Sequence, residues 1–391
     1  MSGKLVIVVL FLVAAAGILW SVRRGAAPTA AGAGSSQSAR SGEPTEITVV
    51  YGTEKQEWLE AATAAFAQKN PEVKVTLVGK GSFEAAQLIL DGKLTPTVWS
   101  PADSLVLSML DADWQTKHGQ PLFGTGEDAP QPLVITPLVF AVWEDRAEAL
   151  VGTSGEGLGW RGIHKAVSSP RGWPAVGGKP EWGFVKLGHT DPTRSNSGMQ
   201  ALLLLSLEYW NKTSGLEVKD LLDPGYQAFV SDVERGVTRF EPSTGTFMVD
   251  MIRFGPSKYD IAVVYENLVI EQIANAQGRW GNLRVYYPKV TLWSDHPAGI
   301  LQADWVTAAQ RTAARSYVAF LRSRPIQERA IAHGFRPADP SVPVRTSDPQ
   351  NPWNKLAPYG VRVDIPPVAT PPDAAVIRNL LTMWSRLVGT R

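Results

Sequence analysis

Cysteine is missing from this sequence of 391 residues. Its absence excludes disulfides, thiolate nucleophiles, cysteine-based metal sites and a lipid-modified N-terminal cysteine. An excess of charge of one sign is missing too, since 38 Lys and Arg residues against 37 Asp and Glu residues leave a formal net charge of +1. This balance gives no electrostatic case for binding nucleic acid.

Histidine is scarce, and its five residues are scattered along the chain. None of them stands in the H-x-x-x-H spacing that places two imidazoles on one helix face. They are His118, His164, His189, His296 and His333. The sequence therefore predicts no metal site, and it carries no motif for a cofactor.

What remains is the composition of a packed globular protein. Hydrophobic residues make up 44% of the sequence and charged residues 19%, which excludes a disordered chain. A chain of this length is too long for one small core. We therefore expect two lobes or domains.

The N-terminal segment, residues 1–24, has the pattern of a signal or membrane anchor. An apolar run from Leu5 to Trp20 follows Lys4 and precedes Arg23 and Arg24. This run is long for a signal peptide and slightly short for a membrane span, so both interpretations stay open. Residues 25–45 have the composition of a flexible linker. We expect an exported protein, in the periplasm or on the extracytoplasmic face, held at the inner membrane by an uncleaved N-terminal helix.

From residue 46 onward, short β-rich runs alternate with amphipathic helical patterns. Strands are predicted over residues 47–51, 73–78, 97–99, 132–143 and 260–265, with helices over 58–68, 83–90, 199–210 and 247–254 among others. This alternation is typical of the α/β class with a mostly parallel sheet. Residues 336–372 are Pro-rich, and a helical pattern follows over 374–387.

Four joints between a strand or loop and a following helix carry small hydroxyl residues or glycine. They are residues 52–53, 81–82, 195–198 and 243–246. The first N–H groups of a helix are free and carry partial positive charge, so such joints can bind an anion or a polar group. Each joint alone could be an ordinary N-cap. Four joints, divided between the two halves of the chain, favour a ligand cleft lined from both sides.

Seven segments in order resemble the solute-binding proteins of ABC transporters, type II, the molybdate- and sulfate-binding-like group. They include ITVVYGTEKQEWLEAATAAFAQKNPEVKVTL, GKGSFEAAQLILDG, TPTVWSPADS, TPLVFAVW, LGHTDPTRSNSGMQALLLL, DIAVVYEN and AFLRSRPIQERAIAHGFRP. The resemblance implies a two-lobed periplasmic-binding-protein fold with a hinge. It implies lobe I over 46–138 and 290–340, lobe II over 139–289, and a separate tail over 341–391.

The resemblance also implies which residues contact the ligand. The hydroxyl contacts of the family fall on Thr53, Ser82 and Ser100 in lobe I, and on Asn196, Ser197 and Tyr265 in lobe II. Thr244 and Thr246, in the joint at 243–246, complete the candidate set. The implied ligand is a small polar molecule or oxyanion, and the implied partner is an ABC permease. The tail also resembles solute-binding domains found with von Willebrand A domains, which suggests such a partner in the membrane.

Two other interpretations compete with solute capture. His189, Asp191 and Ser197 lie in one loop and suggest a hydrolase triad, but triad members converge from separated backbone positions and no G-x-S-x-G elbow is present. We therefore predict that the protein is not an enzyme. A tethered sensor or assembly protein that uses the same fold to bind a protein is the alternative function. Trp58 and Trp99 are the tryptophans that could line a cleft.

Overall fold

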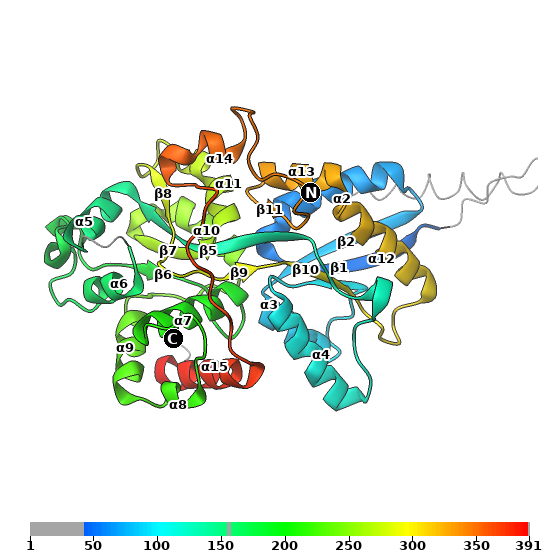
Figure 1. The fold of residues 1–391 in the computed structure, drawn as a ribbon, viewed down its shortest axis with the longest axis horizontal. Helices are drawn as coiled ribbons and strands as arrows, with labels where there is room; N and C mark the ends of the chain where they lie inside the picture. Colours follow the sequence, from blue (N-terminus) through cyan, green and yellow to red (C-terminus); the bar gives the residue numbers. More distant parts are fainter. Residues whose placement is uncertain (1–42, 155–157, 390–391) are drawn as a thin grey trace, which may run out of the picture. The chain divides into compact units, whose positions relative to one another are not determined.

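The structure is a computed structural model that describes residues 43–154 and 158–389. Residues from Glu43 onward form one compact unit built on two β-sheets (Figure 1). The predicted signal or anchor segment, and the linker up to residue 42, lie outside the described residues. Among the described residues, no helix has the length and apolar character needed to cross a membrane.

The first sheet, which belongs to lobe I, has five strands in the order β2-β1-β3-β10-β4. Strand β1 is parallel to both β2 and β3, whereas β10 is antiparallel to β3 and β4. The strands span Thr45–Gly52 (β1), Val73–Lys80 (β2), Val98–Ser100 (β3), Gln131–Pro132 (β4) and Pro297–Ile300 (β10).

Helices cover both faces of this sheet because the strands alternate their side chains between the two faces. On β1, Ile47 and Val49 pack with α2, α12 and α13, while Val50 packs on the other face with α3 and α4. The helices span Gln56–Lys69 (α2), Ser82–Leu90 (α3), Ser104–His118 (α4), Ala308–Leu321 (α12) and Arg324–Ala332 (α13).

The second sheet, whose central strands lie in lobe II, is organised around the long strand β5. This strand is antiparallel to β7, β8, β9 and β11, and only β6 and β7 pair in parallel. The prediction of a mostly parallel sheet is therefore wrong for lobe II. The apolar pattern of residues 132–143 predicts a buried strand, but it does not determine whether that strand runs parallel or antiparallel to its neighbours. The strands span Val134–Trp143 (β5), Leu187–Gly188 (β6), Ile261–Tyr265 (β7), Leu283–Tyr286 (β8), Trp293–Ser294 (β9) and Arg336–Pro337 (β11).

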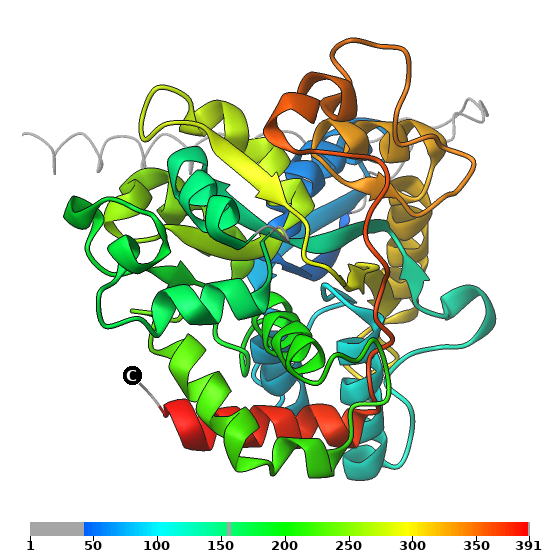
Figure 2. The same ribbon diagram turned by 60° about the vertical axis from the view of Figure 1, so that its left-hand side comes forward.

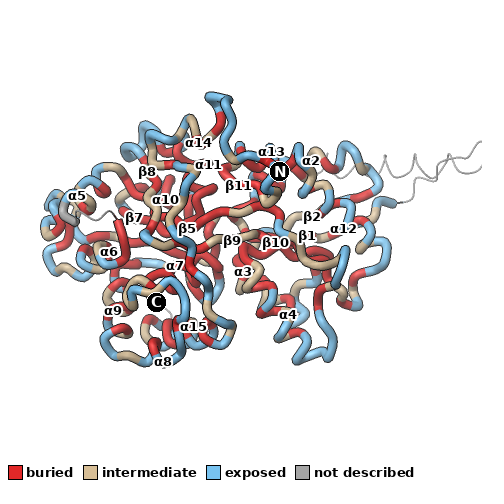
Figure 3. The backbone as a smooth tube through the Cα atoms, viewed as in Figure 1, coloured by how far each residue is buried: buried red, intermediate tan, exposed pale blue. Residues whose placement is uncertain are grey.

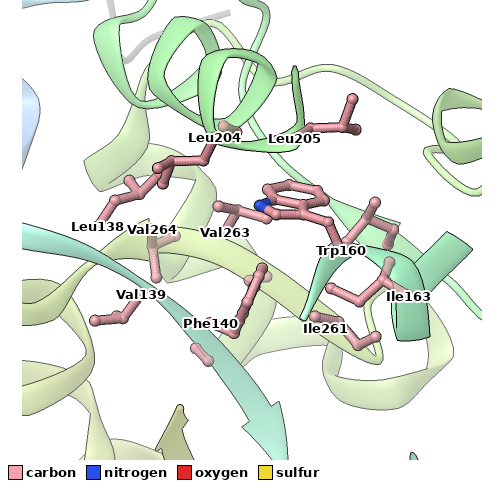
Figure 4. Close-up of a cluster of buried hydrophobic side chains, with 14 of the residues drawn as sticks. Leu138, Val139, Phe140, Trp160, Ile163, Leu204, Leu205, Ile261, Val263 and Val264 are labelled. Carbon is pink, nitrogen blue, oxygen red and sulfur yellow. The ribbon is translucent and has the colours of Figure 1, made fainter. Parts of the chain in front are cut away.

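The core of lobe II is built around helix α7, whose residues from Asn196 to Leu207 are all buried. Figure 4 shows Trp160 enclosed between side chains of α7 and of strands β5 and β7. Its ring meets Phe140 edge to face, with 5.3 Å between the ring centroids. The helices span Glu144–Ser154 (α5), Trp160–Val167 (α6), Asn196–Tyr209 (α7), Val218–Leu221 (α8), Pro224–Glu234 (α9), Thr244–Phe254 (α10) and Glu266–Ala276 (α11).

The C-terminal tail runs from the lobe I side across the molecule to lobe II (Figure 2). It carries α14 (Pro352–Lys355) and ends in α15 (Ala374–Val388), which packs on α8 and α9. Trp384 of α15 donates its indole N–H to Glu234 Oε1 at 2.9 Å. The tail is thus part of the folded unit, and Figure 3 shows buried residues running through both lobes. Short 3-10 turns span Thr53–Lys55, Gly126–Asp128, Trp173–Val176, Pro180–Trp182, Gly255–Ser257 and Ala357–Tyr359.

Candidate functional site

The two lobes meet along a seam where helix N-termini converge from both sides. Lobe I contributes the starts of α3 and α4, and lobe II contributes the starts of α7, α10 and α11. Several hydrogen bonds cross the seam, including three that involve backbone groups. Gly245 N donates to Thr53 Oγ1 at 3.0 Å, Glu84 N to Arg194 O at 3.1 Å, and Asn267 Nδ2 to Glu54 O at 3.0 Å. The lobes are therefore closed on one another.

Gly81 shows how tightly the backbones approach at this seam. A Cβ atom at this position would lie 2.5 Å from Arg194 O and 2.7 Å from Pro242 O, both on lobe II. Its φ of −65° is open to any residue. Glycine is thus required here by the contact between the lobes and not by the local backbone conformation.

A cluster of hydroxyl groups lies on the lobe II side of the seam. Ser197 Oγ is 2.7 Å from Thr244 Oγ1 and 2.8 Å from Thr190 Oγ1, which joins the N-termini of α7 and α10. Ser195, the residue before α7, lies 3.3 Å from Thr244 Oγ1. All four residues are buried. Each hydroxyl can donate or accept, so the cluster can adapt to either kind of ligand group.

A second cluster of polar groups joins α4 of lobe I to α7 and β7 of lobe II. Gln200 Nε2 donates to Asp103 Oδ2 at 2.9 Å and to Ser294 Oγ at 3.0 Å. Asn196 Nδ2 donates to Tyr265 Oη at 2.9 Å. We call these five residues the seam cluster: Asp103, Asn196, Gln200, Tyr265 and Ser294.

The seam cluster carries a carboxyl group without a matching cation. Burial, together with the nearby Asp295, raises the pKa of Asp103 to about 7. Hydrogen bonds from Leu105 N and from Gln200 act in the opposite direction but do not outweigh the loss of hydration. Burial also holds the pKa of the Tyr265 hydroxyl well above its usual value. The site therefore disfavours additional negative charge.

A buried charged trio lies next to this cluster. Lys55 Nζ is 2.7 Å from Glu54 Oε1 and 3.2 Å from His296 Nδ1, and all three side chains are at most 3% exposed. Burial disfavours ionisation of Glu54, but Lys55 and His296 outweigh it and lower its pKa to about 2. Burial and Lys55 lower the pKa of His296 to about 4. The single cation here is already neutralised by Glu54.

Several buried polar atoms at the seam have no hydrogen-bond partner among the described residues. They are Ser100 Oγ, Asn196 Oδ1, Gln200 Oε1 and His296 Nε2. The Gln200 amide turns its nitrogen toward the carbonyl oxygen of Trp293, to which it donates at 3.2 Å, because a carbonyl can only accept. Its Oε1 is thus a free acceptor. A buried polar atom without a partner costs free energy and points to a missing group.

A family model described as bacterial extracellular solute-binding protein matches residues 47–336. The chain belongs to this family. The match confirms the predicted resemblance and places the protein outside the cytoplasm, in a family of solute-binding transport proteins. It favours solute capture over a sensor or assembly function. Among curated proteins, none matches the sequence of this chain.

Solved structures with the same fold confirm the two-lobed architecture of this solute-binding protein. The sulfate-binding protein SubI from Mycobacterium tuberculosis H37Rv is 16% identical, with a TM-score of 0.53 over 87% of this chain and 97% of that one. A periplasmic thiamin binding protein is 12% identical, with a TM-score of 0.60 over 89% and 97%. AfuA from Actinobacillus pleuropneumoniae, with fructose-6-phosphate bound, is 13% identical, with a TM-score of 0.58 over 89% and 99%. At these identities the similarity concerns the fold alone.

The predicted ligand-binding residues of the solute-binding protein fall at the seam. Asn196 bonds Tyr265, and Ser197 bonds Thr244. Thr53 Oγ1 accepts a hydrogen bond from the backbone N–H of Gly245, the residue between Thr244 and Thr246. On lobe I, Ser82 Oγ accepts from Ala102 N at 3.0 Å, which places it beside Ser100. Thr246 differs, because its hydroxyl donates locally to Ser243 O at 3.0 Å. It lines a surface pocket at the seam, which Thr53 also lines.

Sequence reasoning missed Asp103, Gln200, Lys55 and His296 of the seam. Gln200 lies one helical turn after Asn196, so an i, i+4 test along α7 could have found it. Asp103 follows Ser100 in the SPAD segment and is the N-cap of α4. His296 has a φ of 41°, rare for a residue other than glycine, and no sequence signal indicates it.

Other candidate residues lie away from the seam. Trp58 and Trp99 are at most 1% exposed and pack against Phe335 and Phe123, so the idea that they line a cleft is wrong. His189 is buried, with Nδ1 2.9 Å from Thr190 O and Nε2 2.9 Å from Glu234 Oε2. Both ring nitrogens are thus engaged with groups other than Ser197.

Proposed function

We propose that this protein captures a small polar solute between its lobes and delivers it to an ABC-type permease. The binding residues would be the seven predicted side chains at the seam together with Asp103 and Gln200. Closure brings the N-termini of α3 and α7 together, as the bond from Glu84 N to Arg194 O illustrates. A solute that forms hydrogen bonds with both lobes would bind the closed form more tightly than the open form, and would thereby stabilise the closed form.

The observation that carries this proposal is the free acceptor Gln200 Oε1, buried at the boundary between the lobes. Beside it lies the Asp103 carboxyl group, which has no cation of its own. Lys55 is paired with Glu54, and Arg194 with Glu84. The described residues at the seam thus offer acceptors and hydroxyl groups, but no side-chain cation without a carboxylate partner. This chemistry favours a ligand with N–H or O–H donors, neutral or cationic, over an oxyanion.

The experiment is differential scanning fluorimetry of residues 43–391 against a panel of solutes. The panel would contain amines, polyamines, amino acids, sugars, thiamin, sulfate, molybdate and phosphate. A solute at about 100 times its dissociation constant should add ~2.7 kcal/mol of stability. We expect a shift from a donor-bearing class and none from the oxyanions.

Variants then connect the shift to the seam. Gln200→Met removes the free acceptor while keeping side-chain length, and should abolish the shift. Gln87→Met, at a position on α3 where the side chain bonds Asp91, is the matched control and should keep it. The double substitution Ser197→Ala with Tyr265→Phe should weaken binding too. A flat panel from folded protein, or a shift that survives Gln200→Met unchanged, would contradict the proposal.

We also propose that residues 1–24 hold the protein at the inner membrane. The support is the apolar run from Leu5 to Trp20 between basic residues. Membrane fractionation with and without this segment tests the anchor. We further propose lobe boundaries at residues 138–139 and 289–290, as the family resemblance implies. A von Willebrand A-type protein in the membrane is the proposed protein partner.

A further inference from the structure

Glu57, Glu271 and His333 come together from three helices on both sides of the seam. Glu57 lies in the first turn of α2, and His333 directly follows α13, both in lobe I. Glu271 lies in the middle of α11 in lobe II. One donor atom from each residue lies within 4.8 Å of the donor atoms of the other two.

The Glu271 side chain supplies an independent sign of a ligand. It is only 7% exposed, and its Oε1 has no hydrogen-bond partner among the described residues. His333 Nδ1 lies 3.3 Å from this oxygen, within the range of an ion pair. Two ligands on one tetrahedral ion, each about 2.0–2.1 Å from it, lie about 3.4 Å apart. The observed spacing thus suits two ligands of one cation.

The backbone holds these groups in place. Gly334 has a φ of 73°, and a Cβ atom there would lie 2.8 Å from both Asn267 O and Ile270 Cβ of α11. The chain that leaves α13 therefore lies directly on α11. This close approach brings His333 next to Glu271.

A cation has an open and electrostatically favourable route to this point. Glu57 and Glu271 line a surface pocket of about 430 Å³ at the seam, together with Glu54, Glu60 and Asp250. The described residues that line this pocket include no lysine or arginine, although Lys258 pairs with Asp250 from outside it.

We propose that Glu57, Glu271 and His333 bind a divalent transition-metal cation of the Zn²⁺ type across the seam. One imidazole with two carboxylates suits Zn²⁺ or Mn²⁺, whereas Ca²⁺ and Mg²⁺ prefer oxygen ligands alone. The remaining coordination positions face the pocket and would be filled by water. Because the ligands come from both lobes, the bound ion favours the closed form.

The test is calorimetric titration of the purified full chain with Zn²⁺ alone, after treatment with a chelator. We expect one saturable equivalent per chain, and a visible Co²⁺ spectrum typical of four or five nitrogen and oxygen ligands. Glu271→Gln and His333→Gln should each weaken Zn²⁺ binding by roughly 100-fold or more, because even outer-shell partners of metal ligands change affinity 10–100-fold. His118→Gln, at an exposed histidine that stacks on Trp114, is the matched control and should bind normally.

Other outcomes decide against the site. Absence of saturable Zn²⁺ binding overturns it, and so does binding that both substitutions leave unchanged, since the ion would then lie elsewhere. If Glu271→Gln does not fold, Glu57→Gln at an exposed position takes its place, and an unchanged Zn²⁺ affinity there contradicts a three-ligand site. The titration contains no solute, so its result is independent of the proposed solute capture.

Discussion

The buried pair of Lys55 and Glu54 allows a quantitative test of what holds the seam together. We consider Lys55→Met, which keeps most of the side-chain volume and removes the charge. Lys55 Nζ is 2.7 Å from Glu54 Oε1 and also donates to Pro101 O at 3.2 Å. After the substitution, the Glu54 carboxylate remains buried, and its cationic partner is gone.

The size of the effect follows from what the orphaned carboxylate can do. If it stays charged, removing one partner of a buried pair costs about 3–5 kcal/mol. If it takes up a proton at pH 7, its pKa must rise from 4.5 to 7, which costs about 3.4 kcal/mol at ~1.4 kcal/mol per unit. Both routes give a similar loss. We therefore expect Lys55→Met to lower the free energy of unfolding by about 3–5 kcal/mol.

A matched control lies in the lobe I sheet, on the strand pair β1 and β2. Lys74 Nζ also lies 2.7 Å from a carboxylate oxygen, Glu46 Oε1, but these side chains are 60% and 62% exposed. Lys74→Met should change the free energy of unfolding by less than about 1 kcal/mol, because water already screens the pair. The two ion pairs have the same N–O distance but differ in burial. Comparing the two losses of unfolding free energy therefore separates the effect of desolvation from that of contact geometry.

The assay is urea unfolding of residues 43–391, followed by tryptophan fluorescence and circular dichroism, whose transitions must coincide. Adding Glu54→Gln to Lys55→Met should recover part of the loss, as a double-mutant cycle reveals. In the wild type, the pKa of Glu54 is lowered to about 2, so its stabilisation persists until the pH falls below 4.5. Above pH 4.5 this stabilisation is constant, whereas the orphaned carboxylate of Lys55→Met takes up a proton at lower cost as the pH falls. The difference in unfolding free energy between wild type and Lys55→Met should therefore narrow from pH 7 to pH 4. A loss as small as that of Lys74→Met would refute the reasoning.

Three further predictions follow from the seam and the tail. The folded-state pKa of Asp103, about 7, exceeds its ordinary 3.8, so ionisation destabilises the fold as the pH rises through this window. Urea unfolding of Asp103→Asn should show its stability rising relative to wild type by about 1.4 kcal/mol per pH unit between pH 4 and 7, and a flat difference would contradict this. Gly81→Ala should separate the lobes, which would raise the radius of gyration in solution scattering and lower the free energy of unfolding by about 1–3 kcal/mol. Gly162→Ala, with open space around it, should change neither quantity in this way. Trp384→Phe removes the donor to the buried Glu234 and should cost about 1–3 kcal/mol in thermal unfolding, and no loss would show that α15 docks without this bond.

The sequence by itself determined the family and most of the regular elements. The predicted helix over 83–90 is α3, Ser82–Leu90, and the predicted strand over 260–265 is β7, Ile261–Tyr265. These predictions rest on local periodicity and on turn residues, which act within a few residues along the chain. The hydroxyl and glycine residues at strand–helix joints were equally visible, because they lie within a few residues of the predicted strand ends and helix starts.

Other elements and groups depended on partners distant in the sequence. The strand β10, Pro297–Ile300, has no strand pattern of its own and forms because it pairs with β3 and β4. The direction of β5 relative to its neighbours was likewise undetermined by its apolar pattern.

The chemistry of the seam was decided by tertiary structure alone. Lys55 and His296 lie 241 positions apart, and only the fold brings them to 3.2 Å. The same folding buries Asp103 beside Gln200 and removes the water that would otherwise hydrate it. Sequence patterns report which side chains are present near a joint. Desolvation and charge pairing depend on the groups that both lobes bring to one buried point.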